Sequence, residues 1–211
     1  MSEWVAVTGA TGFIGRTICR LLHDEGWKLR ALVRSESRAQ ALKGCVDEWV
    51  PGDLDNRASL QKLILNARAV VHCAGAVRGA SQQAFDRVNV DGVRNIVDAI
   101  VNSVNAPRLL SLSSLAAREP CLSFYATSKR KGEQVLEQQA RALDWVALRP
   151  PAVYGPGDRE LLPLVRLMAK GIAPVLGNHD ARFSMIYSQD IARAVQGWLL
   201  RDSCVSGVYS L

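Results

Sequence analysis

Tyr125 and Lys129 are the strongest candidates for proton chemistry, because they stand four residues apart in a segment with helical periodicity. This spacing places both side chains on one face of a helix, one turn apart. A lysine ammonium at that distance is expected to lower the pKa of the phenol. Tyr125 could then give and take a proton near neutral pH.

A second chemical signature is formed by Gly9, Gly12 and Gly15, which follow an apolar strand pattern and open a helical one. In this context the first glycine allows a tight turn and the second lets a pyrophosphate approach the main chain. The third lets the helix pack closely on the sheet, and the free N–H groups of the helix N-terminus face the phosphates. The motif therefore predicts a dinucleotide site, and the alternative is a glycine-rich turn that binds nothing.

Ser113 and Ser114 directly follow the strand-like run Leu109–Leu112. They are expected at the carboxyl end of a strand, where ligands bind in open α/β sheets. Either serine could instead be an ordinary turn residue.

Strand-like and helix-like patterns alternate along the whole chain. Strands are predicted at about 3–8, 28–33, 46–50, 69–74, 107–112 and 145–149, and helices at about 12–25, 57–66, 82–104, 123–142, 160–170 and 188–201. This order predicts a doubly wound parallel sheet, Rossmann-like, in one α/β domain over residues 1–211. Prolines and glycines gather after Arg149, so residues 150–187 are expected to contribute to a small or truncated C-terminal substrate lobe.

Composition excludes several other classes of protein. The net charge of +6 comes from arginines spread along the chain, which indicates a solvated basic surface and no nucleic-acid partner. Five widely spaced cysteines without a Cys-x-x-Cys pair indicate a reducing compartment and no metal site. No apolar run approaches 18 residues and no leader pattern opens the chain, so a cytoplasmic protein that spans no membrane is expected.

Taken together, the motifs resemble the extended short-chain dehydrogenase/reductase family, which includes nucleotide-sugar epimerases and dehydratases. The matching segments, in order, are Thr8–Gly15, Asp53-Leu54, Val88–Asn95, Ser113-Ser114, Tyr125 with Lys129, and Arg149–Asp158. Two departures stand out: the interval from Ser114 to Tyr125 is short, and family members usually continue further into a substrate lobe. The chain is therefore either a compact variant or a shortened piece of a longer one.

The resemblance implies roles for particular residues. Tyr125 would be the general acid/base, Lys129 would hold the ribose, Ser114 would bond the reacting substrate oxygen, and Asn89 would support the lysine through water. Arg78 and Arg182, with Ser114, are candidate substrate contacts. The cofactor contacts implied are Gly9, Thr11, Gly12, Phe13, Ile14, Gly15, Arg34, Asp53, Leu54, Ala74, Gly75, Ala76, Tyr125, Lys129, Pro150 and Val153.

The residues after the second predicted strand bear on the choice of cofactor. Arg34 can pair bidentately with a 2′-phosphate, and Arg16 could add a second positive charge. These residues favour NADP(H), whereas Glu36 is an argument for NAD(H).

The resulting prediction is an NAD(P)-dependent oxidoreductase of the epimerase/dehydratase type. Hydride would pass between the nicotinamide and a hydroxyl or carbonyl of a small-molecule substrate such as a nucleotide sugar. A net reductase and an epimerase or dehydratase both remain open. The alternative from another class is a non-catalytic NADP(H)-binding sensor or assembly module. A homodimer through the helices at 82–104 and 123–142 is also expected from the resemblance.

Overall fold

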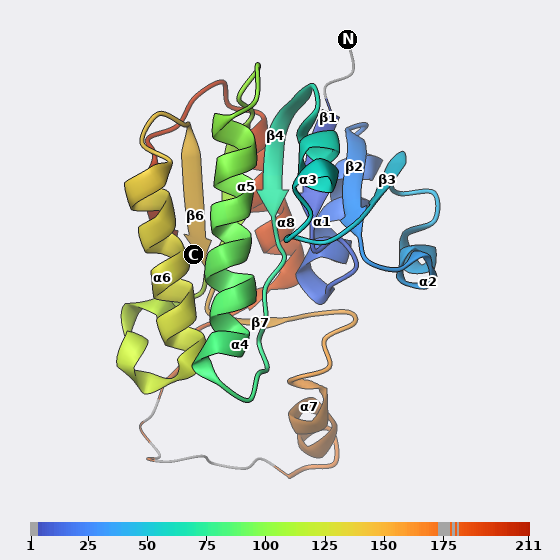
Figure 1. Ribbon diagram of the computed structural model, residues 1–211. Coiled ribbons are helices and arrows are strands. Elements are labelled where there is room, and N and C mark those ends of the chain that lie inside the picture. Colours follow the sequence, from blue (N-terminus) through green and yellow to red (C-terminus); the bar gives the residue numbers. More distant parts are fainter. Residues whose placement is uncertain (1–3, 173–177, 179, 181) are drawn as a thin grey trace.

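The centre of the molecule is a parallel sheet of seven strands in the order β3-β2-β1-β4-β5-β6-β9, seen from one face in Figure 1. The computed structural model describes residues 4–172, 178, 180 and 182–211, without the side chains of Glu36, Arg38 and Ala41. The strands of the sheet are β1 (Trp4–Thr8), β2 (Lys28–Val33), β3 (Glu48–Pro51), β4 (Ala67–His72), β5 (Arg108–Leu112), β6 (Trp145–Arg149) and β9 (Gly207–Ser210). The predicted doubly wound parallel sheet is confirmed.

Helices cover both faces of this sheet. Residues of α1 and α8 pack in one apolar cluster against one face, and residues of α3, α5 and α6 pack in a second cluster against the other. The α-helices are α1 (Phe13–Asp24), α2 (Glu36–Ala39), α3 (Arg57–Ile64), α4 (Gln82–Asp86), α5 (Gly92–Val101), α6 (Phe124–Gln139), α7 (Leu162–Met168) and α8 (Ser188–Leu199). Short 3-10 turns lie at Gln40–Leu42, Leu115–Arg118 and Pro120–Leu122.

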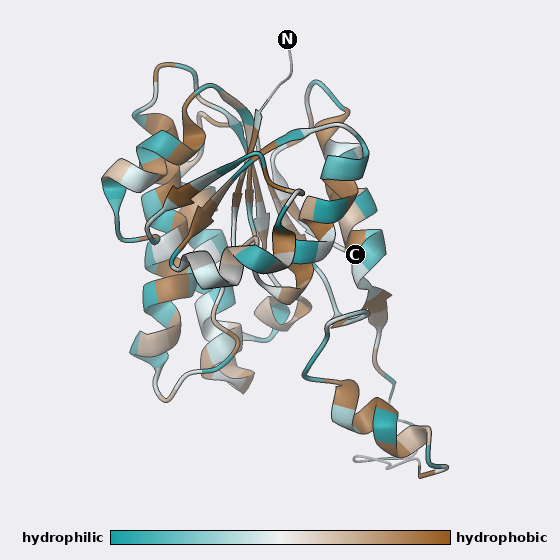
Figure 2. Ribbon diagram, turned by 90° about the vertical axis from the view of Figure 1, so that its right-hand side faces the viewer, coloured by the Kyte–Doolittle hydropathy of each residue, from teal (hydrophilic) through white to brown (hydrophobic). Residues whose placement is uncertain are grey.

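The central strands are mostly apolar because both of their sides are buried. In β1, Val5 and Val7 face the cluster under α1 and α8, while Ala6 between them faces the cluster under α5 and α6. A strand covered on both faces reads as a continuous apolar run rather than as an alternation. Figure 2 shows the same arrangement as brown strands inside helices that carry teal outer faces.

One long predicted helix, at 82–104, is interrupted. It consists of α4, a π-helical turn at Arg87–Asp91, and α5. Such turns are rare and are frequently found at functional sites. Here the turn carries Asn89, whose side chain is buried.

After β6 the chain leaves the main sheet and forms a second, two-stranded sheet. The strands β7 (Ala152–Tyr154) and β8 (Met185–Tyr187) pair in parallel, and α7 lies between them in sequence. Figures 1 and 2 show α7 beyond the carboxyl ends of the strands, away from the rest of the molecule. The two short strands had no counterpart among the predicted elements.

Glu133 of α6, which is buried, forms an ion pair with the partly buried Arg149 at the end of β6. Arg149 donates to both carboxylate oxygens, at 2.7 and 2.6 Å, and the Ser113 hydroxyl donates to one of them at 2.5 Å. Burial alone would raise the pKa of Glu133, but these hydrogen bonds outweigh it and hold the pKa below its ordinary value. The pair joins α6 to the strand edge on which the candidate site depends.

Replacing Glu133 by Gln is expected to lower the free energy of unfolding by about 3 kcal/mol at pH 7, because Arg149 is left without its carboxylate. Urea denaturation followed by circular dichroism measures the change. Since the folded-state pKa of Glu133 is depressed, its contribution is present at neutral pH and is lost as the pH falls through that pKa. Glu137→Gln, on the exposed face of the same helix, is the control; equal losses for both variants would contradict the role of burial.

Candidate active site and dinucleotide cleft

A cleft of about 640 Å³ opens at the carboxyl ends of β1, β2, β3 and β4. The sheet order reverses between β1 and β4, and ligands of open α/β sheets bind at such a switch point. Nine predicted cofactor contacts line the cleft: Gly9, Thr11, Gly12, Arg34, Asp53, Leu54, Ala74, Gly75 and Ala76. The structure thus brings together residues from four separate strand ends.

The three glycines serve different physical ends. Gly9 has a φ of 68°, and a Cβ there would lie 2.5 Å from the Ala74 nitrogen. A Cβ on Gly15 would lie 2.2 Å from the Gly9 carbonyl oxygen, so this glycine lets α1 pack against the turn. Gly12 is exposed and borders the cleft, and a Cβ there would meet only the Gly9 oxygen, at 3.1 Å. Gly12 is therefore the glycine whose missing side chain serves the cleft.

The N-terminus of α1 is suited to bind an anion. Gly12 is its N-cap and offers no side-chain hydrogen bond to the first turn, so the first amide groups of the helix are available to a ligand. The helix dipole adds a partial positive charge at the same place. A pyrophosphate fits this arrangement of cleft, glycine and helix.

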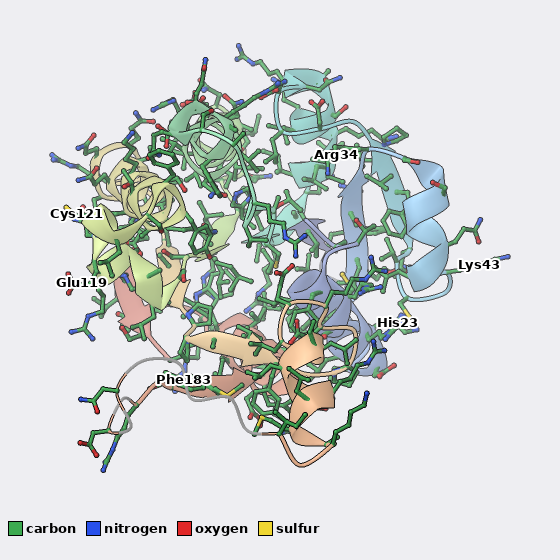
Figure 3. All side chains as sticks on the ribbon, turned by 90° about the horizontal axis from the view of Figure 1, so that it is seen from below. His23, Arg34, Lys43, Glu119, Cys121 and Phe183 are labelled. Carbon is green, nitrogen blue, oxygen red and sulfur yellow. The ribbon has the colours of Figure 1, made fainter. Side chains whose placement is uncertain are left out.

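The far end of the cleft carries opposite charges. Arg34 is exposed, and among the described residues no ion pair engages it. Figure 3 shows it on the β2 side of the molecule, opposite the side that carries Phe183. Arg87 also lines the cleft and donates to Asp55 through Nε at 3.2 Å and Nη2 at 2.8 Å. Sequence reasoning missed Arg87 and Asp55, because nothing in their spacing indicates that they meet.

The proton-transfer candidates lie beside the cleft on α6 and the loop after β5. Tyr125 packs edge-on against Phe85, with 6.2 Å between ring centres. Burial raises the pKa of Tyr125, and a hydrogen bond with Ser114 opposes that rise. The expectation that Lys129 lowers the pKa of Tyr125 is therefore wrong for this state of the protein. The reason is that burial of the phenol dominates, and the Lys129 ammonium donates to the Leu112 carbonyl, at 2.9 Å, instead of to the phenol.

Lys129 nevertheless borders the cleft. A Cβ on Gly75, which lines the cleft, would lie 3.1 Å from Lys129 Nζ. Burial lowers the pKa of the ammonium to about 8, against the influence of Cys73 and Glu133, which raise it. At pH 7 the side chain is mostly charged.

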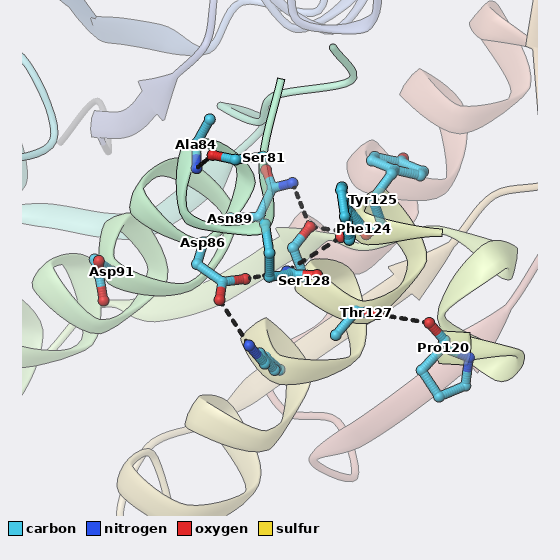
Figure 4. A network of polar contacts seen from close by, with 12 residues as sticks. Ser81, Ala84, Asp86, Asn89, Asp91, Pro120, Phe124, Tyr125, Thr127 and Ser128 are labelled. Atoms are coloured by element: carbon cyan, nitrogen blue, oxygen red, sulfur yellow. Dashed lines mark hydrogen bonds and ion pairs between the residues drawn. The ribbon is translucent and has the colours of Figure 1, made fainter. Parts of the chain in front are cut away.

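Asn89 connects the cleft loop to α6. Its amide nitrogen donates to the Ala76 carbonyl at 2.9 Å and to the Ser128 hydroxyl at 2.8 Å, and its oxygen accepts from the Ala76 amide at 2.8 Å. Figure 4 shows the part of this network in which Asn89, on the π-helical turn, reaches Ser128 near the start of α6. Because Asn89 is 2% exposed, its contacts make it a positioning residue for Ala76 and α6.

Other predicted site residues lie elsewhere. Ile14 and Val153 pack against the apolar core, Pro150 is buried, and Phe13 and Gly15 lie in α1 outside the cleft lining. Arg182 is exposed in the loop before β8.

Two further arginines have their own neighbours. Arg78 is an exposed residue that pairs with Glu160 at 2.9 Å. Arg16 lies against Gly157, where a Cβ would be 3.1 Å from its guanidinium, and it does not line the cleft beside Arg34. The side chain of Glu36, the argument for NAD(H), lies outside the described part of the structure.

Comparison with known proteins agrees with this geometry. Residues 5–204 match the model of the NAD dependent epimerase/dehydratase family. The chain belongs to this family. Nicotinamide dependence, which the family's name states, is consistent with the cleft and the uncapped helix above it.

Two curated relatives are similar over most of the chain. Ceramide reductase of Caulobacter vibrioides is 43% identical over 191 residues, covering 89% of this chain and 58% of the relative. The decarboxylating sterol-4-alpha-carboxylate 3-dehydrogenase of Schizosaccharomyces pombe is 30% identical over 202 residues, covering 86% and 57%. The chain thus spans somewhat more than half the length of these relatives.

Among solved structures, UDP-glucuronic acid 4-epimerase from Bacillus cereus in complex with NAD superposes with a TM-score of 0.80. It is 20% identical, and the match covers 99% of this chain and 78% of that one. This likeness supports the fold. Within the described residues, no helix combines the length and apolar character that a membrane span requires.

Separate substitutions of Gly12 and Gly15 should show that the first glycine serves dinucleotide binding and the second serves stability. Gly12→Ala is expected to keep the melting temperature within a few degrees and to weaken dinucleotide binding at least ~10-fold, because its Cβ stands where the phosphates approach. Gly15→Ala is expected to lose about 2 kcal/mol or more of stability, through overpacking against Gly9. Calorimetric titration with NADPH measures binding, and thermal denaturation measures stability. If Gly15→Ala lost binding without losing stability, the separate roles assigned to the two glycines would be refuted.

Proposed function

We propose that this protein is an NAD(P)-dependent oxidoreductase that reduces a ketone or oxidises the corresponding alcohol. The observation that carries the proposal is the position of Lys129 Nζ beside Gly75, at the cleft wall, with Tyr125 one turn earlier on α6. A dinucleotide bound along the cleft would bring its ribose to the lysine. A phenol and a hydroxyl would then stand beside the reacting carbon.

Each side chain has a definite part in this reaction. In the reductive direction the Tyr125 phenol gives its proton to the substrate oxygen, which the Ser114 hydroxyl holds by a hydrogen bond. The Lys129 ammonium has three donors, of which one goes to the Leu112 carbonyl and another can bond a ribose hydroxyl. When bound, the nicotinamide supplies or takes up the hydride.

An apolar substrate fits the molecule better than a nucleotide sugar does. Two relatives act, by their names, on a ceramide and on a sterol carboxylate. The unit formed by β7, α7 and β8, which we propose as the substrate lobe over 150–187, exposes apolar side chains beyond the strand ends. They are Leu162, Val165, Leu167, Met168, Ile172, Phe183 and Met185. These side chains support a long-chain or polycyclic ketone as the substrate class.

Arg34 supports NADP(H) as the cofactor. Its exposed guanidinium lines the cleft close to the end of β2, where a 2′-phosphate would be bound. NADPH in turn favours net reduction over an epimerase cycle. The homodimer through the helices at 82–104 and 123–142 stays a prediction.

Tyr125→Phe tests the reaction. Turnover of a long-chain ketone is expected to fall by about 10²–10⁴-fold, because the proton donor is removed, while the dissociation constant for the dinucleotide stays the same. Turnover is followed by the absorbance of NADPH. Tyr209→Phe in β9, whose hydroxyl contacts only the Val205 carbonyl among the described residues, is the matched control. Full activity in Tyr125→Phe would refute the role of Tyr125 as proton donor. A wild-type protein that binds NADPH without any turnover would favour the non-catalytic sensor module.

Arg34→Ala tests the cofactor. The variant is expected to lose about 1.5–3 kcal/mol of NADPH binding, about 10- to 150-fold in the dissociation constant, with little change for NADH. Titration calorimetry at fixed salt gives both values. Arg141→Ala, an exposed arginine after α6, controls for the loss of net charge. Equal losses for NADPH and NADH would overturn the case for phosphate recognition.

A further inference from the structure

A row of polar side chains crosses the face of the sheet that α5 and α6 cover. Thr8, His72 and Ser111 are paired in register on neighbouring strands, and each of them is at most 4% exposed. Apolar side chains such as Val70 and Leu109 neighbour this row on the same face. A polar row in such a place needs hydrogen-bond partners.

Only one of the two ring nitrogens of His72 has a hydrogen-bond partner among the described residues. Its Nδ1 lies 2.8 Å from Thr8 Oγ1, whereas Nε2 is buried and has no partner among the described residues. Thr8 Oγ1 already accepts a hydrogen bond from the Ala74 amide, at 3.3 Å, and can donate its own proton to Nδ1. That arrangement places the imidazole proton on Nε2. Burial and the nearby Lys129 lower the pKa of His72 to about 3, so the ring is neutral.

His72 lines a small cavity between the sheet and α6. Its volume is about 10 Å³, at the lower limit for one water molecule. The polar side chains around it are His72, Asn89, Ser111, Ser113, Lys129 and Glu133. The Ser113 hydroxyl and the Glu133 carboxylate are engaged with each other and with Arg149, and Asn89 is engaged with Ala76 and Ser128. His72, Ser111 and Lys129 remain to bind a ligand there.

We propose that this cavity is a binding site for a single water molecule, which links His72 Nε2 to the ammonium of Lys129. The water accepts the Nε2 proton and one ammonium proton, and it donates to the Ser111 hydroxyl. His72 is thus a positioning residue for Lys129, below the cleft and out of reach of substrate. Its part in turnover rests on the proposed function, but the water site does not.

The site stabilises the charged form of a lysine whose pKa is lowered by burial. Water is the neutral ligand that can accept from two donors while it donates to an oxygen. The titratable and charged groups around it are Cys73 after β4, Glu133 on α6, and Arg149 and Arg130, which pair with Glu133. Cys73 keeps its proton, because burial raises the pKa of its thiol. Among these groups, only Glu133 is an anion, and three donors already hold it.

The test compares His72→Gln with His72→Met, two side chains of similar length. Glutamine keeps an N–H near the Nε2 position and methionine does not, while both lose the ring contact with Thr8. The titration of Lys129 is followed by its ¹³Cε chemical shift in the protein without dinucleotide. Lys129 in His72→Met is expected to titrate at least about 0.5 pH unit below that in His72→Gln, because its charged form loses a hydrogen-bond acceptor. The basic limb of the pH–rate profile should move in the same direction.

A high-resolution crystal structure of the unsubstituted protein tests the site without a variant. An ordered water within hydrogen-bond distance of both His72 Nε2 and Lys129 Nζ supports the proposal. Absence of that water, or the same Lys129 titration in both variants, overturns it. Failure of the proposed function would be seen in a different result: turnover would be unaffected in Tyr125→Phe, or there would be no turnover at all. In either case the water would still be present, and Lys129 would still titrate differently in the two His72 variants.

Discussion

The close approach of two backbone turns, one after β1 and one after β4, is the constraint on which the fold and the cleft both depend. A Cβ on Gly9 would collide with the Ala74 nitrogen, so only glycine fits there. The Cys73 amide donates a hydrogen bond to the Thr8 carbonyl at 3.1 Å. The turns meet where the sheet order reverses. Because of this contact, the N-terminus of α1 and the loop at 74–76 face the same cleft.

Hydrogen bonds of Asn89 connect these turns to α6. Ala76 is held by Asn89 on both its amide and its carbonyl, and Asn89 in turn holds Ser128. Gly132 lets α6 pack closely, since a Cβ there would lie 2.4 Å from the Asn89 carbonyl oxygen. The same helix presents Tyr125 and Lys129, so the residues proposed for chemistry are fixed relative to the turn at which we propose that phosphate binds. A preorganised site of this kind lowers the cost of orienting the reactants.

Burial and direct contacts shift the pKa values beneath the site in opposite directions, and burial decides the direction for Lys129 and Tyr125 but not for Glu133. Desolvation lowers the pKa of Lys129 and raises that of Tyr125, so both groups are shifted toward their neutral forms. Glu133 stays charged because Arg149 and Ser113 bind it directly. The simple expectation of an ammonium acidifying a neighbouring phenol failed, because helical spacing fixes the positions of two backbone segments but not the acceptor that a long side chain finds. In this structure Lys129 finds the Leu112 carbonyl.

The sequence by itself determined the parallel sheet, the six predicted strands within about two residues, and the glycine turn, because apolar runs and glycine spacing are local properties of the chain. It also indicated that Arg34, Asp53 and Ala74 border one cleft, since parallel strands end on the same edge. Only the tertiary structure decided the pairing of Arg87 with Asp55, the π-helical turn at Asn89, and the row of Thr8, His72 and Ser111. These contacts join residues far apart in sequence, and their existence depends on strand order and on burial, which no local pattern encodes.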